Sequence, residues 1–278
     1  MVARLLISLI AIPALLGIAI LGELWFVLLV TFIGLLGLYE VYRIIGLLSI
    51  KAYYLPGFMA LLALLGNAYC DYVPYFSIVI LFIVVTILWH LVSVVIRRFR
   101  IIKSASSRNS AGIKINRAIF TILGSLYMGW PLSLAISLRE GTDGIYWILL
   151  VMLGTFTTDT ASFCVGKIIG RHQLAPIISP SKTVEGALGG VVVGVIGILI
   201  MLDTFNLELH SVSVAVLFSV LFTISAQIGD LLESMLKRKA FIKDSGSIVP
   251  GHGGVLDRLD SVVLVLLFVY YSRSWVIS

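Results

Sequence analysis

Charged residues are scarce in this sequence. Only 12% of its 278 residues are Asp, Glu, Lys or Arg, whereas 60% are hydrophobic and the mean hydropathy is +1.10. Soluble domains carry about 25% charged residues, so roughly half of the usual polar surface is missing. This composition excludes one large soluble domain. A membrane-spanning helix needs about 20 residues, so nine of them would use roughly 180 and leave little room for a separate soluble domain.

Cysteine is scarce as well. Cys70 and Cys164 are the two cysteines of the sequence, and neither lies in a CxxC or Cys/His pattern. This excludes a disulfide framework and a zinc site, and predicts two free thiols.

Arg4 precedes a long apolar run that resembles a signal peptide. No small-x-small cleavage site precedes Glu23, however, so we expect a retained first helix.

Long apolar runs make up most of the chain. They predict an all-α fold, a polytopic membrane bundle of about nine transmembrane helices. The runs cover residues 4–22, 24–42, 53–69, 74–96, 118–138, 144–168, 184–202, 211–235 and 255–275.

The basic residues favour one side of the membrane. If the amino terminus is cytoplasmic, 17 of the 20 Lys and Arg residues fall on the cytoplasmic side. Such asymmetry predicts an amino terminus inside the cell and a carboxyl terminus outside it. The net charge of +6 is therefore a topology signal, and we expect no nucleic-acid partner.

Residues 97–117 hold seven basic and no acidic residues, which suits anionic headgroups. Direct contact with a phosphate-bearing substrate is the alternative for this connection.

Acidic residues within the predicted spans point to a site. A charged side chain in a membrane helix costs about 2.5 to 3.5 kcal/mol, so those that persist usually have a function. Asp159 lies in the sixth run. Asp230 and Glu233 lie three residues apart in the eighth run, and Asp257 and Asp260 three apart at the start of the ninth. We expect each of these pairs to share one face of a helix.

Carboxylates that meet in one cleft repel one another unless a cation lies between them. Mg²⁺ suits such a cleft, because it takes one or two carboxylates and completes its shell with water and substrate phosphates. The candidate metal ligands are Asp159, Asp230, Asp257 and Asp260. The alternative is that these acids pair only with neighbouring cations at helix ends, as Asp257 would with Arg258 and Glu233 with Lys237.

Two further segments have phosphate-binding chemistry. Residues 179–186 (SPSKTVEG) lead into the seventh run, where hydroxyls, free N–H groups and Lys182 would form an anion site; plain helix capping is the alternative. Residues 237–254 combine clustered cations with a glycine-rich loop around His252, which fits a Mg²⁺-complexed polyphosphate. His252 is a candidate acid or base, or a hydrogen-bonding residue of that loop. These features predict an intramembrane enzyme that transfers a phosphoryl or nucleotidyl group at the cytoplasmic face. The candidate substrate-binding residues are Ser181, Lys182, Lys237, Arg238, Lys243 and Asp244.

The same residues carry a resemblance to a known family. Residues 234–238 (SMLKR), 243–244 (KD) and 250–260 (PGHGGVLDRLD) resemble the signature of the phosphatidate cytidylyltransferase, or CDP-diacylglycerol synthase, family. Val249 departs conservatively from the Leu, Ile or Phe usual there. Residues 179–186 resemble a second family segment, and Asp159 falls in a third, weaker one. The resemblance covers the carboxyl-terminal half of the chain.

The resemblance implies transfer of CMP from CTP to phosphatidate, giving CDP-diacylglycerol and pyrophosphate for phospholipid biosynthesis. It further implies dependence on Mg²⁺, with a second, monovalent cation as an open question, and a bacterial-type inner membrane with the active site facing the cytoplasm. Residues 1–117 would form the amino-terminal spans and the basic connection, and residues 118–278 the catalytic region. The expected catalytic residues are Asp230, Asp257, Lys237, Arg238, Lys243 and His252.

The expected partners are CTP, phosphatidate and the bilayer. A homodimer is a further expectation, because Gly186, Gly190 and Gly194 form a ridge of small residues on the seventh run. Two other functions remain as alternatives. A CTP-dependent lipid kinase would transfer the γ-phosphoryl group and release CDP. An ion-coupled transporter would place its charges near the bilayer midplane in paired halves, whereas here they lie on one side and in one half.

Overall fold

The computed structural model describes residues 17–103, 116–207, 209–246 and 253–276. Within these ranges the chain is helical apart from one short hairpin, which confirms the predicted all-α class. The elements are α2 (Glu23–Leu47), α3 (Tyr54–Cys70), α4 (Tyr75–Lys103), α5 (Asn116–Glu140), α6 (Gly144–Ile169), β1 (Gln173–Ala175), β2 (Ser179–Thr183), α7 (Val184–Thr204), α8 (Val212–Lys239), the 3₁₀ helix η1 (Leu256–Arg258) and α9 (Asp260–Val276).

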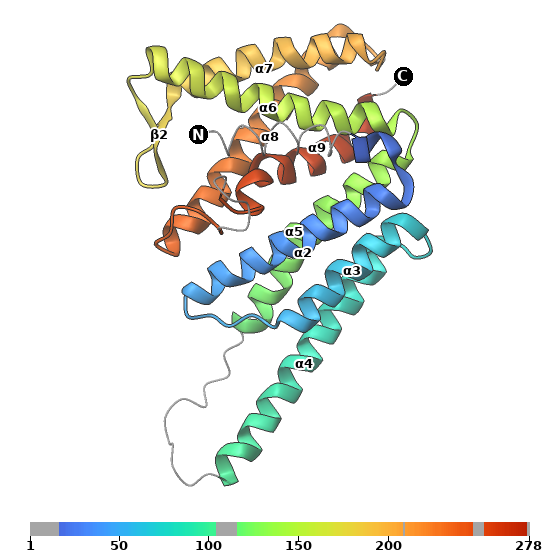
Figure 1. Ribbon diagram of the computed structural model, residues 1–278, viewed down its shortest axis with the longest axis vertical. Helices are drawn as coiled ribbons and strands as arrows, with labels where there is room; N and C mark the ends of the chain where they lie inside the picture. The colour runs from blue at the N-terminus through green and yellow to red at the C-terminus, as the bar shows by residue number, and fades with distance from the viewer. Residues whose placement is uncertain (1–16, 104–115, 208, 247–252, 277–278) are drawn as a thin grey trace.

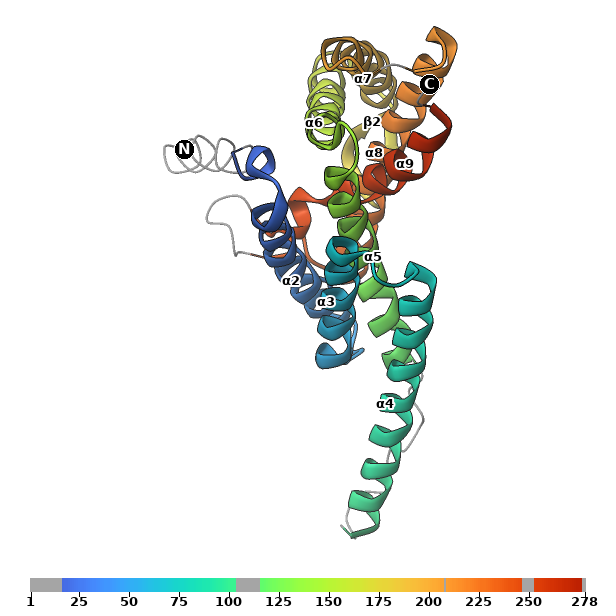
Figure 2. The same cartoon turned by 90° about the vertical axis from the view of Figure 1, so that its right-hand side faces the viewer.

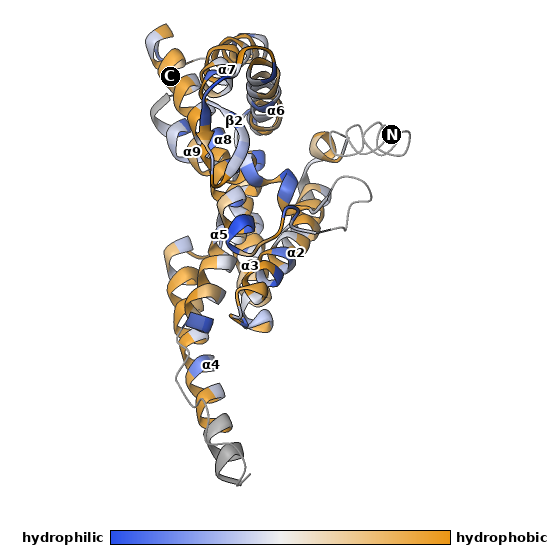
Figure 3. Ribbon diagram, turned by 90° about the vertical axis from the view of Figure 1, so that its left-hand side faces the viewer, coloured by the Kyte–Doolittle hydropathy of each residue, from blue (hydrophilic) through white to orange (hydrophobic). Residues whose placement is uncertain are grey.

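Six of the described helices are long and apolar enough to cross a membrane: α2, α4, α5, α6, α7 and α8. They show an integral membrane protein. Helix α3 is apolar but has only 17 residues, and α9 also has 17. The predicted first span, residues 4–22, lies mostly outside the described residues. Figure 3 shows hydrophobic residues along most of the ribbon of these helices, with few hydrophilic segments between them.

The helices form two groups that α5 joins. Helices α6 and α7 run side by side at one end of the molecule, close to α8 and α9 (Figure 1). Helices α2 and α3 pack on the other side of α5, and α4 extends away from the rest (Figures 1 and 2). Because α5 contacts helices of both groups, it fixes the amino-terminal helices relative to the carboxyl-terminal ones.

A buried tyrosine organises the packing of α2, α3 and α5. Tyr42 is fully buried, and its hydroxyl donates to the carbonyl of Thr121 at 2.8 Å and lies 2.6 Å from Oγ of Ser125. A Cβ atom on Gly57 of α3 or Gly124 of α5 would collide with the Tyr42 ring. The glycines therefore leave room for a large side chain whose polar end is satisfied inside the bundle.

The glycine ridge of α7 packs within the chain. A Cβ atom on Gly186 would lie 2.7 Å from the carbonyl oxygen of Ser162 on α6. A Cβ atom on Gly194 would lie 2.6 Å from Cγ2 of Thr223 on α8. The ridge is thus the close contact between α7 and its two neighbours, α6 and α8, and it is occupied by them.

The segment before α7 forms a hairpin that the apolar runs of the sequence do not predict. Strands β1 and β2 pair antiparallel, with Gln173 opposite Thr183 and Ala175 opposite Ser179. Helix α7 begins only at Val184, after Pro180, and Oγ1 of Thr183 caps it by accepting the N–H of Gly186 at 3.1 Å. The hydroxyl that caps α7 is therefore that of Thr183. The side chain of Lys182 extends towards α8 instead.

Candidate functional site

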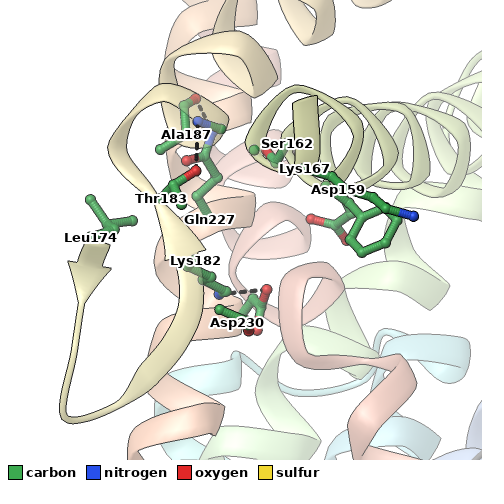
Figure 4. Close-up of a pocket in the computed structure, with 13 residues that line it drawn as sticks. Asp159, Ser162, Lys167, Leu174, Lys182, Thr183, Ala187, Gln227 and Asp230 are labelled. Atoms are coloured by element: carbon green, nitrogen blue, oxygen red, sulfur yellow. Dashed lines mark hydrogen bonds and ion pairs between the residues drawn. The ribbon is translucent and has the colours of Figure 1, made fainter. Parts of the chain in front are cut away.

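A cavity of about 520 Å³ opens between α6, β2, α7 and α8 (Figure 4). Its walls combine apolar side chains, such as Phe163 and Leu174, with the charged side chains of Asp159, Lys182 and Asp230. Ligand sites typically have volumes of roughly 300 to 1,000 Å³ and mostly apolar walls with a few polar groups. The cavity therefore has the size and chemistry of a site for an amphipathic ligand.

An ion pair lies at the polar end of this cavity. Nζ of Lys182, on β2, lies 2.5 Å from Oδ2 of Asp230, on α8 (Figure 4). Both side chains keep about a quarter of their surface exposed, 24% and 28%. Lys182, predicted to bind phosphate, thus lies beside a predicted metal ligand and remains reachable from the cavity.

Three carboxylates from three different helices come together near this pair. Asp159 of α6, Asp230 of α8 and Asp260 of α9 repel one another electrostatically. Ser261 links two of them, because its Oγ donates to Oδ2 of Asp159 at 3.1 Å and its main-chain N–H donates to Oδ1 of Asp260 at 2.7 Å. The structure therefore brings together three of the four predicted metal ligands.

The fourth predicted ligand has different neighbours. Asp257 lies in η1, whereas Asp260 begins α9, so the expectation that the two share one helix face is wrong. Nζ of Lys237 lies 2.7 Å from Oδ1 of Asp257 and 2.5 Å from Oε2 of Glu233, which is completely buried. One residue, Leu259, lies between η1 and α9, so the two aspartates belong to successive helical elements.

Main-chain donors also bind the Asp257 carboxylate. The N–H of Gly254 donates to its Oδ2 at 2.8 Å and the N–H of Ser245 at 3.0 Å. Burial by itself raises the pKa of Asp257, but the Lys237 ammonium and these N–H groups outweigh burial and hold the pKa below its ordinary value. Asp257 is therefore ionised at neutral pH, and it organises the turn between α8 and α9.

The remaining predicted residues are less enclosed. Arg238 is exposed, and its Nε donates to the carbonyl of Ile178 at 3.1 Å, which ties the hairpin to the end of α8. His252 lies outside the described residues. Three predicted substrate-binding residues are exposed near the same end of the helices: Ser181, Lys243 and Asp244.

One residue of this region was missed by the sequence reading. Glu40 of α2 is fully buried and contacts Ser245 and the main chain of η1. It is the lone carboxylate within the second apolar run. Asp159 was predicted to belong to a site because a charged residue within a span usually has a function. The same argument applies to Glu40.

The donor chemistry fits a hard divalent cation only in part. Across the described ranges, no three His, Cys, Asp or Glu side chains are arranged to hold a metal ion by themselves. Lys182 and Lys237 each lie against a carboxylate that such an ion could use. Mg²⁺, however, needs only one or two carboxylates when water and substrate phosphates complete its shell. The acids therefore suit an ion that arrives with a phosphate-bearing substrate.

The fold and the site define a class of protein: an integral membrane protein whose charged site lies where α6 to α9 meet at one end. The model of the cytidylyltransferase family matches residues 2–275, and the chain belongs to this family. This confirms the resemblance found in the sequence.

Individual relatives carry a more specific name. The chain is 31% identical over 276 residues to the phosphatidate cytidylyltransferase of Bacillus subtilis, covering 96% of each chain. It is 39% identical over 149 residues to that of Staphylococcus haemolyticus, and 38% identical over 151 residues to that of Staphylococcus saprophyticus. Both staphylococcal alignments cover 54% of this chain and 56% of the relative, so the chain matches about half the length of these two proteins.

Proposed function

We propose that this protein transfers CMP from CTP to phosphatidate, forming CDP-diacylglycerol and pyrophosphate. The observation that carries the proposal is the meeting of Asp159, Lys182 and Asp230 at a cavity between apolar helices, with the Asp260 carboxylate close to them. Membership of the cytidylyltransferase family and the names of the relatives support it.

The reaction needs positioning more than covalent chemistry. The phosphate of phosphatidate is already an anion, so it attacks the α-phosphorus of CTP directly and displaces pyrophosphate. The protein must hold two anions in line and stabilise the charge of the leaving group. The cations at this end of the helices, Lys182, Lys237, Arg238 and Lys243, take that role in the proposal, with Ser181 and Asp244 at the rim. Apolar walls such as Phe163 and Leu174 suit a substrate that stays in the bilayer.

Mg²⁺ is the cofactor in this proposal. Asp230 and Asp257 would hold it, with Asp159 and Asp260 as further ligands, and a second, monovalent ion would fit among the same acids. When bound, the ion neutralises phosphate charge and orients the phosphates for in-line attack. Lys182 and Lys237 each pair with one of the two principal acids, so each ammonium can exchange a carboxylate for a substrate phosphate.

The site faces the cytoplasm of a bacterial-type inner membrane in this proposal. The charged residues come from the carboxyl-terminal ends of α6 and α8 and from the amino-terminal ends of α7 and α9. Spans that alternate in direction would place these four ends on the same side of the membrane. The 17 basic residues assigned to that side support a cytoplasmic amino terminus and nine spans. Residues 118–278 form the catalytic region, and residues 1–117 hold the amino-terminal helices packed against it.

A homodimer also belongs to the proposal, but it needs a face other than the glycine ridge of α7. That ridge contacts Ser162 of α6 and Thr223 of α8 within the chain. Light scattering of the purified protein in detergent measures the mass of the complex. A mass of one chain, about 30.4 kDa after subtraction of detergent, would contradict the dimer.

Product analysis tests the proposed function. The full chain, purified in detergent with phosphatidate, should form CDP-diacylglycerol and pyrophosphate only when CTP is added. The matched control is Asp230→Asn, which keeps the size of the side chain and removes its charge, and it should fold but lose activity. Release of CDP with a phosphorylated lipid would identify a lipid kinase instead. A folded protein that converts no phosphatidate would refute the proposal.

A further inference from the structure

Glu40 connects α2 to the turn between α8 and η1, the short helix that carries Asp257. It lies on α2, more than 200 residues before that turn in the sequence, and no part of it is exposed. Its Oε2 accepts the Oγ–H of Ser245 at 2.9 Å and the N–H of Leu256 at 2.8 Å, and its Oε1 accepts the N–H of Val255 at 3.2 Å. The carboxylate therefore binds Ser245, within the segment between α8 and η1, and the main chain where η1 begins.

The packing around Glu40 is close. A Cβ atom on Gly246 would collide with Oε1 of Glu40. A Cβ atom on Gly254 would collide with Oγ of Ser245 and lie 2.5 Å from Oε2 of Glu40. The two glycines let the main chain of the turn approach a buried charge from both sides. A carboxylate buried in this way is stable only because donors surround it.

Ser245 relays this contact to Asp257. Its single Oγ–H donates to Oε2 of Glu40 at 2.9 Å, and the same Oγ lies 3.0 Å from Oδ2 of Asp257, which the main-chain N–H of Ser245 binds. The same Oδ2 accepts the main-chain N–H groups of Ser245 and Gly254. Lys237 then holds the other oxygen of Asp257. A continuous hydrogen-bonded chain thus runs from α2 through the turn to the cation at the end of α8.

We propose that Glu40 is a positioning residue for the transfer reaction: it fixes the turn between α8 and η1, and through Ser245 it fixes Asp257 and Lys237. The hydrogen bonds of Glu40 go to Ser245, Val255 and Leu256, which are not among the residues that line the cavity, so it acts through its neighbours. The inference rests on the proposed function and deepens it. Because a misplacement of about 1 Å can lower a rate roughly 10²-fold, loosening the turn should affect turnover more than substrate binding.

Glu40→Gln is the test variant, and Tyr42→Phe is its matched control. The carboxamide of Gln keeps the size of Glu but presents an N–H₂ group to a pocket of donors, so at least one hydrogen bond is lost. Tyr42 lies two residues away on the same helix, is equally buried, and bonds only to α5 within the described contacts. Both variants remove a buried hydrogen bond made by a side chain of α2. Only the hydrogen bonds of Glu40 reach the turn, so only Glu40→Gln should loosen it.

The measurements are kcat, the KM values for CTP and phosphatidate, the melting temperature, and hydrogen exchange at Val255 and Leu256. Glu40→Gln should lower kcat about 10- to 100-fold with KM changes below about threefold, and should speed exchange at the two amides. Tyr42→Phe should lower the melting temperature at least as much, with kcat within about twofold of the wild type. Adding Ser245→Ala to Glu40→Gln should cause little further loss, because the two residues act as a unit.

The outcomes separate this inference from the proposed function. No CDP-diacylglycerol from the folded wild type would refute the function and the positioning role together. An active wild type with unchanged exchange and unchanged kcat in Glu40→Gln would refute the positioning role alone. Equal losses of kcat in Glu40→Gln and Tyr42→Phe would show that Glu40 only stabilises the fold, and that too would overturn the inference.

Discussion

Nζ of Lys237 lies 2.7 Å from Oδ1 of Asp257, a residue that follows it by 20 positions and belongs to another element. The same ammonium lies 2.5 Å from Oε2 of Glu233, one turn earlier on α8. One cation therefore pairs with two enclosed carboxylates, and it links the end of α8 to the turn before α9. Because all three side chains are at most 13% exposed, solvent screens this cluster weakly.

Removing that cation should destabilise the protein. Lys237→Met would leave Glu233 and Asp257 without their shared partner, and breaking a buried ion pair on one side costs about 3 to 5 kcal/mol. We expect a clear drop in melting temperature in detergent. Lys239→Met, which removes an exposed cation on the same turn, is the control and should change little. Equal melting temperatures for the two variants would contradict the role of Lys237.

Lys182 should matter for substrate and much less for stability. Its pair with Asp230 is partly exposed, and such pairs contribute about 0 to 1 kcal/mol to folding. A cation aimed at developing negative charge, in contrast, contributes roughly 10² to 10³ in rate. Lys182→Met should therefore lower kcat/KM by about that factor with a nearly unchanged melting temperature. Lys239→Met serves again as the control, and equal activities in both variants would exclude Lys182 from the site.

Filling the cavity should block the reaction. Ala187 of α7 lines the cavity, whereas its neighbour Leu188 is 63% exposed on the surface of the helix. Ala187→Phe should raise the KM for at least one substrate about tenfold or more, because the added ring occupies part of the 520 Å³. Leu188→Phe adds a ring one residue away and outside the cavity. Steady-state kinetics should separate the two, and similar KM values would mean that substrates bind elsewhere.

The contact between α8 and α9 should tolerate no side chain at Gly229. A Cβ atom there would lie 2.5 Å from the carbonyl oxygen of Asp260 and 3.2 Å from Cα of Ser261. Since these are main-chain atoms, the helices must separate, which costs typically about 1 to 3 kcal/mol. Gly229→Ala should therefore lower both the melting temperature and the activity. Gly46→Ala, where a Cβ meets nothing within 4 Å, is the control and should leave both unchanged.

Removal of divalent cations should stop the reaction. We expect a chelator to abolish product formation, and Mg²⁺ to restore it. A readout independent of activity is the melting temperature with CTP present, which should rise when Mg²⁺ is added because a bound ligand stabilises the folded state. Asp230→Asn should weaken this rise. Full activity in the chelator, or an undiminished rise in Asp230→Asn, would contradict the proposed metal site.

The sequence sufficed for the class of fold because membrane burial is a local property. A helix must satisfy its own backbone groups in the bilayer, so an apolar run of sufficient length predicts a spanning helix without reference to the rest of the chain. Helices α5, α6, α7 and α8 accordingly begin and end within a few residues of the predicted runs. The hairpin of β1 and β2 escaped prediction because it is short, polar and paired over only a few residues.

The grouping of the acids was only partly predictable. Spacing correctly suggested that Asp230 and Glu233 share α8 and that Glu233 could pair with Lys237, but it could not show that Lys182 would meet Asp230 or that Lys237 would also meet Asp257. It also placed Asp257 with Asp260, and the turn between η1 and α9 separates them. Helical spacing holds only while the helix continues, and nothing in the local sequence fixed where α9 begins.

By itself, the sequence determined that the chain lies in a membrane, that its charges gather near the ends of its last helices, and which family it resembles. These follow from composition, from the cost of burying charge and from a specific motif. Only the tertiary structure decided which carboxylates meet, which cations pair with Asp230 and Asp257, and that Glu40 of α2 reaches the turn before Asp257. Contacts between residues 200 positions apart depend on how the helices pack against α5, and that packing is a property of the whole chain.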